Sequence, residues 1–193
     1  MTGDLFKWTA EGGRASNGGR GVWHSGVWRT VSGPLIPCKH GLHLVTSRQL
    51  VPWIATELWH AEADPNRVRI DLDDKIVVGR ARITKRVTEW DRDMAVRFAT
   101  DCAERVLPLW EAIYPEDDRP GRAIQAARRG DMAEAARAAE AARAAEAAEA
   151  AEAAGAAEAA GAAWAAGAAW AAGAARAAEV DWQNTHLSYL LGL

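Results

Sequence analysis

The sequence predicts an α+β protein, in which a small mixed β-sheet domain over residues 1–89 is followed by an Ala-rich helical bundle over residues 90–193. Three observations lead to this fold class. Before residue 90, apolar and polar residues alternate in several short segments, which is typical of strands. Between residues 91 and 114, apolar residues recur at helical spacing. From residue 133 to 179, every third residue is Glu, Arg, Gly or Trp and all the others are Ala, the residue with the highest helix propensity.

The N-terminal part carries the strand pattern in separate short stretches, and polar or Gly-rich turns lie between them. Thr46 can cap a short helix that runs through Gln49 to Trp53. Asp73 and Asp74 form a predicted turn. The predicted strands cover residues 5–8, part of 21–31, 42–44, 58–61, 68–72 and 75–87.

Two helices are predicted before the Ala-rich tract. Asp91 or Asp93 caps the first, which continues to Tyr114 with a kink at Pro108. The second begins at Arg119, where Pro120 occupies the first turn, and it ends at Gly130. The acidic residues of this region are expected to form a solvated face and helix caps rather than a catalytic carboxylate pair: Asp101, Glu104, Glu111, Glu116, Asp117 and Asp118.

The Ala-rich tract has a period of three, so its marked positions move around a helix by roughly 60° at each step. This rotation favours two or more short helices folded back on each other, with a break near Gly155 or Gly161, over one long helix. Trp164 and Trp170 are separated by about 240° around a helix. We expect one of them to bind a partner, the alternative being that both pack against the helix of residues 93–114.

Composition narrows the class of function. The formal net charge of -3 gives no indication of a nucleic-acid or anionic-membrane partner. Cys38 and Cys102 are too few for a disulfide framework, and residues 1–10 lack the pattern of a secretory signal. Charges recur in every turn of the first half of the Ala-rich tract, which disfavours a membrane span. We therefore expect a cytoplasmic protein.

One cluster resembles a metal site. Cys38, His40 and His43 are spaced C-x-H-x-x-H, and His24 or His60 could supply a fourth ligand. Structural zinc usually takes two regularly spaced pairs of ligands, and the second pair is missing here. A catalytic Cys–His pair would also need an orienting third residue, which the sequence does not identify. The prediction is no metal, no cofactor and no catalytic residue.

The Gly-rich segment of residues 12–21 raises the alternative of a phosphate-binding loop. It lacks the Gly-Lys-Ser/Thr sequence of such loops, and no apolar strand leads through it into a helix. This segment, together with His24, His40 and His43, still defines the alternative function: a nucleotide-binding or transferase-like enzyme in the N-terminal domain.

Two segments carry a resemblance to a family: VRFATDCAERVLPLWE at residues 96–111 and YPEDDRPGRAIQAAR at residues 114–128. With the closing Gln183-Asn184-Thr185-His186-Leu187, residues 92–193 resemble the alanine-rich immunity protein domain of actinobacteria and their phages. Residues 39–44 and 75–87 are similar to a small uncharacterised domain that often precedes it. The strict triplet repeat departs from the family pattern.

The resemblance implies a helical fold without catalytic residues. The predicted function is non-catalytic binding of a partner protein, as an immunity-type or phage accessory protein acting on a toxin or a host defence protein. A structural oligomerisation module, in which Ala faces of several chains pack together, is the remaining alternative.

Overall fold

The computed structural model describes residues 4–131, 133–134 and 162–193, with the backbone alone at residues 109, 113 and 162–176. The chain divides into two units. The first contains Met1–Arg92 together with Val180–Leu193, and the second contains Asp93–Glu179. The predicted domain ranges, 1–89 for a small β-rich domain and 90–193 for an Ala-rich helical domain, stay predictions.

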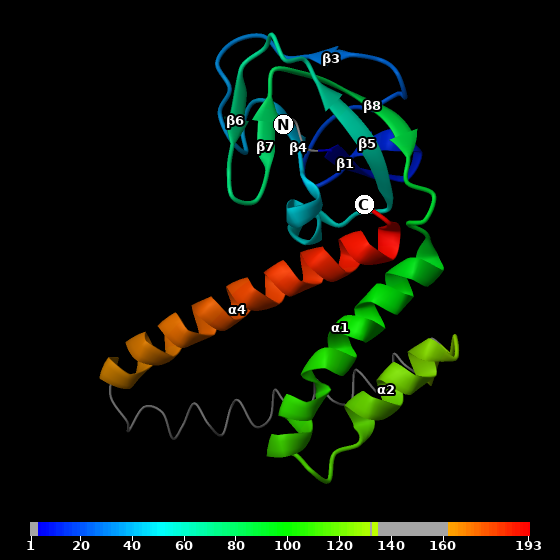
Figure 1. Ribbon diagram of the computed structural model, residues 1–193, viewed down its shortest axis with the longest axis vertical. Helices are drawn as coiled ribbons and strands as arrows, with labels where there is room; N and C mark the ends of the chain where they lie inside the picture. The colour runs from blue at the N-terminus through cyan, green and yellow to red at the C-terminus, as the bar shows by residue number, and fades with distance from the viewer. Residues whose placement is uncertain (1–3, 132, 135–161) are drawn as a thin grey trace. The chain divides into compact units, whose positions relative to one another are not determined.

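The first unit contains two antiparallel sheets (Figure 1). One has the strand order β2-β1-β5-β8-β3, and the other has the order β4-β7-β6. The strands of the first are β1 (Leu5–Ala10), β2 (Arg14–Ala15), β3 (Arg29–Thr30), β5 (Glu57–Ala63) and β8 (Arg80–Arg86). Those of the second are β4 (Leu42–Leu44), β6 (Arg69–Asp71) and β7 (Ile76–Val78).

The predicted fold class, a mixed sheet followed by a helical bundle, is wrong in both parts. Every strand pair in the described residues is antiparallel. Several consecutive strands are joined by connections too short for a parallel crossover, which needs a dozen or more residues: residues 11–13 join β1 to β2, and residues 72–75 join β6 to β7. At the other end of the chain, Val180–Leu193 belongs to the sheet-containing unit. Leu187 and Leu191 are buried there, so this segment completes the core of that unit instead of a bundle.

The stretch predicted as one strand over residues 75–87 forms two strands in different sheets. β7 and β8 meet at the buried Gly79. The Gly79 carbonyl accepts a hydrogen bond from Val31 N at 2.9 Å, and its amide donates to Val68 O at 3.1 Å. Apolar residues continue through both strands, so the sequence pattern alone does not reveal that the chain passes from one sheet to the other at Gly79. Of residues 21–31, only Arg29–Thr30 forms a strand.

One apolar core lies between the two sheets. Leu44 and Ile76 contribute from the smaller sheet, and Leu5 and Ile83 from the larger one. Phe6 and Val45 exchange two backbone hydrogen bonds of 2.7 and 2.9 Å, which join β1 to the end of β4. The shared core and this bridge hold β1 and β4 beside each other.

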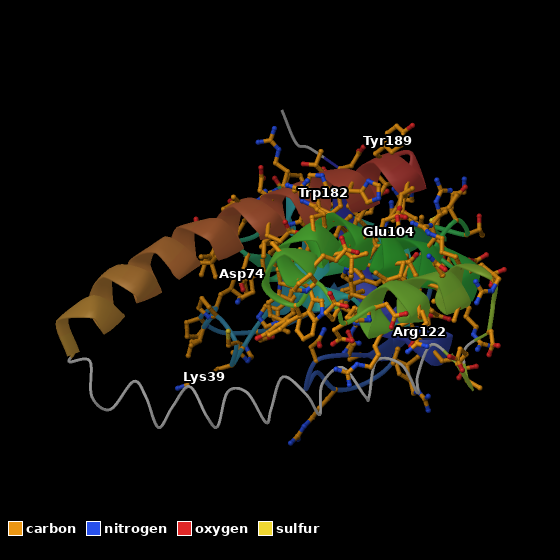
Figure 2. All side chains as sticks on the ribbon, turned by 90° about the horizontal axis from the view of Figure 1, so that it is seen from below. Lys39, Asp74, Glu104, Arg122, Trp182 and Tyr189 are labelled. Carbon is orange, nitrogen blue, oxygen red and sulfur yellow. The ribbon has the colours of Figure 1, made fainter. Side chains whose placement is uncertain are left out.

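The end of the last helix, α4 (Ala162–Leu191), packs on the first unit. Asn184 Oδ1 accepts a hydrogen bond from Val51 N at 2.8 Å, and Ser188 Oγ donates to Ser47 O at 2.9 Å. These contacts lie on two consecutive 3₁₀ turns, η2 (Ser47–Gln49) and η3 (Val51–Trp53), which follow the predicted cap residue Thr46. Tyr189 instead projects away from the helix end, as Figure 2 shows.

In α4, the helix passes through Gly167 and Gly173 without interruption. The break predicted near Gly155 or Gly161 lies outside the described residues. The residues that would distinguish segmented helices from one long helix over the first part of the tract also lie outside the described residues. No helix in the described part of the chain is long and apolar enough to cross a membrane.

The second unit confirms both predicted central helices. They are α1 (Arg92–Ile113), which contains Pro108, and α2 (Arg119–Arg128). Asp117 Oδ1 accepts a hydrogen bond from the Arg119 amide at 3.1 Å, whereas Asp118 at the N-cap position makes no side-chain capping bond. Arg128 on α2 forms ion pairs with Asp101 and Glu104 on α1, of which Glu104 is labelled in Figure 2. These carboxylates thus hold two helices together.

Candidate functional site

A pocket of about 370 Å³ opens in the first unit. Three segments supply most of its wall: residues 6–8 of β1, the Gly-rich loop of residues 15–20, and residues 38–43 leading into β4. Its other lining residues are Trp23, Arg29, Val31, Val45, Trp53 and Lys75. The bridge between β1 and the end of β4 therefore positions two sides of the pocket.

The pocket is strongly basic although the chain as a whole carries a net charge of -3. No Asp or Glu occurs among its lining residues. The cationic side chains of its wall are Lys7, Arg20, Arg29, Lys39 and Lys75. Such a concentration of one sign of charge in a concave site attracts small anions.

Lys7 lies on β1, opposite Trp59 of the neighbouring strand β5. Its Nζ lies 5.5 Å from the centroid of the Trp23 ring, and the Arg29 guanidinium lies 4.9 Å from the same ring. Within the described residues, Lys7 has no ion pair. Burial, and secondarily the charge of Arg29, lower the pKa of Lys7 to about 8.

Arg29 connects the pocket to the Gly-rich loop. Its two terminal nitrogens donate to Val22 O at 3.2 Å and to Arg20 O at 3.3 Å. Gly21, which lies between these carbonyls, has a φ of 83°, and a Cβ there would lie 3.1 Å from the guanidinium. Glycine at this position thus allows the loop to close around Arg29.

Lys75 differs from Lys7 because it has a carboxylate partner. Its buried Nζ lies 2.8 Å from Asp74 Oδ2 and 4.8 Å from the centroid of the Trp53 ring. The hydrogen bond that Lys75 donates to Asp74 raises the pKa of Lys75, against the effect of burial. Asp74 and the exposed Lys39 are labelled in Figure 2. Lys75 is therefore a permanently charged part of the wall.

Glu57 on β5 lies behind the pocket and holds the turn that leads into the Gly-rich loop. Its buried carboxylate accepts hydrogen bonds from Gly13 N at 3.0 Å, Gly12 N at 3.2 Å and Thr9 Oγ1 at 3.1 Å. Burial favours the protonated carboxyl, but these bonds and one from Trp59 favour the anion more strongly and keep the pKa of Glu57 below its usual value. Glu57 thus has a positioning role.

The structure brings Cys38, His40 and His43, the residues with the metal-like spacing, to the pocket wall. His40 Nε2 lies 2.8 Å from Ser32 O. His43 Nε2 is buried, with no hydrogen-bond partner in the described part of the chain. Burial, followed by the charges of Lys7 and Lys75, lowers the pKa of His43, so this ring is neutral at pH 7.

The proposed fourth metal ligands lie elsewhere. Neither His24 nor His60 lines the pocket, and the His60 ring lies 5.1 Å from that of Phe6. Across residues 4–131, 133–134 and 162–193, no group of three His, Cys, Asp or Glu side chains is placed to hold a metal ion. The side chains of Trp164 and Trp170, the predicted partner-binding residues, lie outside the described part of α4.

Sequence reasoning missed the cations of this site. Lys7 lies inside β1 on the same face as Leu5 and Thr9, both of which are buried, and only the burial of that face marks it as an unusual lysine. Arg29 and Lys75 gave no signal in the sequence, because they reach the pocket from segments distant from Lys7.

Searches against known protein families, characterised proteins and solved structures give no match to this chain. The resemblance of residues 92–193 to the alanine-rich immunity domain therefore stays a prediction. The candidate site rests on its own geometry and charge.

Proposed function

We propose that the first unit binds a small anionic molecule through a phosphate group in the basic pocket. The observation that carries this proposal is the set of five cationic side chains on a wall without carboxylates. Arg29 and Lys7 are the most important of these cations for binding an anion, since neither has a carboxylate partner in the described residues.

The size and lining of the pocket support a small-molecule ligand. Its volume of about 370 Å³ falls in the lower part of the range of about 300–1,000 Å³ typical of ligand sites. The half-buried Trp53 adds an aromatic wall beside Lys75. A nucleotide matches this combination of phosphate-binding cations and an aromatic surface, which agrees with the rival function that the Gly-rich segment suggested.

The test is isothermal titration calorimetry with adenosine 5′-monophosphate, ribose 5-phosphate and adenosine. We expect both phosphates to bind and adenosine not to bind, because the charges provide most of the attraction. Binding should weaken with added salt. If adenosine binds as tightly as its monophosphate, the phosphate site is refuted.

Variants locate the binding site. Lys7→Met and Arg29→Ala should each weaken ribose 5-phosphate binding by about 10- to 100-fold, the value of one charge-assisted contact. Lys85→Met removes a charge from an exposed position outside the pocket and should leave the affinity unchanged. Equal effects of Lys7→Met and Lys85→Met would place the ligand elsewhere.

Binding of a partner protein by Trp164 or Trp170 remains a separate proposal, and with it the immunity-type or phage accessory role, the cytoplasmic location and self-association. It rests on the sequence resemblance and on the preference of interfaces for buried aromatic side chains. Pull-down of neighbouring gene products with each Trp→Ala variant tests it. Unchanged recovery with both variants would argue against these residues.

A further inference from the structure

We propose that Lys7 is a nucleophilic amine, which forms an imine with the carbonyl carbon of a phosphate-bearing aldehyde or ketone in the basic pocket. This inference rests on the proposed function, because the remaining cations would hold the phosphate. It names the class of ligand: a small phosphorylated carbonyl compound.

The surroundings of Lys7 distinguish it from a structural lysine. Lys75, in the same pocket, is held by Asp74 at 2.8 Å and is therefore unavailable as a nucleophile. Lys7 contacts the face of Trp23 at 5.5 Å and shares that ring with Arg29. Because it is also partly exposed to the pocket, its amine can meet a bound ligand.

An amine attacks a carbonyl only in its neutral form. Enzymes that use lysine as a nucleophile make the neutral amine accessible by desolvation or by a neighbouring cation. Lys7 has both, and its pKa falls to about 8. At pH 7.5, roughly a quarter of the amine is then neutral, against about a thousandth for an exposed lysine.

The reaction is balanced without an oxidant or reductant. The lone pair of Lys7 Nζ forms a bond to the carbonyl carbon, and the π electrons of the C=O bond move to oxygen. Proton transfer from nitrogen to oxygen gives a carbinolamine. Its hydroxyl then leaves as water while the C=N bond forms, so one amine and one carbonyl give one imine and one water.

Arg29 places the phosphate near the reacting amine. Arg29 and Lys7 line the same pocket, so a small molecule bound there can reach both cations. The two backbone carbonyls that hold Arg29 fix its orientation. A phosphate bound there would bring the rest of the ligand over Trp23 and towards Lys7.

Three related probes test this inference with the full chain. Pyridoxal 5′-phosphate has both the aldehyde and the phosphate, pyridoxal lacks the phosphate, and pyridoxine 5′-phosphate lacks the aldehyde. Each is incubated with the protein and reduced with sodium borohydride, and the labelled peptides are identified by mass spectrometry. The chain has four lysines, Lys7, Lys39, Lys75 and Lys85, so each site is resolved.

We expect pyridoxal 5′-phosphate to label Lys7 at least ten times faster than Lys85. Pyridoxine 5′-phosphate should slow this labelling by competition, and pyridoxal should label Lys7 less efficiently. Lys7→Arg should abolish the fast labelling while its circular dichroism spectrum remains that of the parent, and Lys85→Arg should retain it. Even labelling of Lys7, Lys39 and Lys85 overturns the inference.

The probes also separate this inference from the proposed function. If pyridoxine 5′-phosphate binds by calorimetry but Lys7 is not labelled by the aldehyde, the phosphate site stands and the imine is refuted. If pyridoxal labels Lys7 as fast as its phosphate does, and pyridoxine 5′-phosphate does not compete, Lys7 is nucleophilic and the phosphate site is refuted.

Discussion

At the scale of single residues, Lys7 places a charge where the fold favours an apolar side chain. Its neighbours on the same face of β1, Leu5 and Thr9, are both buried, and it has no counter-ion within the described residues. Proteins often retain such unfavourable groups at functional sites at the expense of stability. Lys7 should therefore be identifiable by its effect on unfolding as well as by ligand binding.

We predict that Lys7→Met raises the free energy of unfolding by about 1–2 kcal/mol at pH 7, because it removes a partly desolvated charge. Arg29 and His43 face the same amine, and the Arg29 charge adds to the penalty. Since the pKa of Lys7 is about 8 in the folded state and 10.5 for an unperturbed lysine, the folded protein binds fewer protons than the unfolded chain between these pH values. The parent protein thus gains stability as the pH rises through this range.

The difference in the free energy of unfolding between Lys7→Met and the parent should therefore shrink between pH 8 and pH 10.5. Urea unfolding at pH 7 and pH 10 measures it, and comparison with Lys85→Met corrects for the loss of one surface charge. A Met variant less stable than the parent at both pH values would show that the ammonium stabilises the fold.

Removal of the Glu57 charge should destabilise the protein, in contrast to removal of the Lys7 charge. The Glu57 anion is stabilised by four donors, so Glu57→Gln should lower the free energy of unfolding by about 2 kcal/mol at pH 7. The pKa of Glu57 lies below 4.5, the ordinary value of a glutamate. Its contribution is therefore complete above pH 4.5 and is lost as the pH falls through the folded-state value.

Chemical denaturation at pH 7 and pH 3 measures the Glu57 effect. Glu62→Gln, on the same strand but at an exposed position, serves as the control. If the two variants lose equal stability at pH 7, the hydrogen bonds to Gly12 and Gly13 do not hold the turn.

At the scale of elements, local patterns predicted most strands and both central helices, since alternation and helix caps act over a few residues. The strand predicted over residues 75–87 was wrong in extent because Gly79 directs the chain into a second sheet through hydrogen bonds to Val31 and Val68. Gly41 is similar: a Cβ there would lie 2.3 Å from Val77 Cγ1, a close approach that depends on tertiary structure. Such contacts between distant segments leave no periodic signal.

Asn184 is the element-scale test, because it joins α4 to the turn η3. Asn184→Ala leaves the Val51 amide without its acceptor and should reduce the free energy of unfolding by about 1–2 kcal/mol. Thr185→Ala is the matched control: the exposed Thr185 hydroxyl bonds only within its own helix, to Asp181 O, and its loss should cost less than about 0.5 kcal/mol. Thermal or urea unfolding compares them, and equal losses would exclude the Asn184 contact as the cause.

At the scale of the whole molecule, the first unit is discontinuous in sequence, and Asp93–Glu179 is inserted within it. Composition separated a sheet-rich part from an Ala-rich part. It grouped Val180–Leu193 with the Ala-rich part because these residues follow it in the sequence, whereas the structure groups them with the sheets. Cys38, His40 and His43 line the pocket, but in the sequence only their spacing was notable, and neither a metal nor a catalytic site was predicted there. The decisive cations Lys7, Arg29 and Lys75 come together only in the folded unit, which is why the site was not predicted as basic.

The discontinuity also bears on the order of events during synthesis. The sheets are complete in sequence once residue 86 has left the ribosome, yet Leu187 and Leu191 of the same unit emerge only after the whole inserted segment. At roughly 5–20 residues per second, this interval is on the order of ten seconds. During it, the surface beside η2 and η3 that receives α4 is uncovered on the nascent chain and accessible to chaperones and proteases.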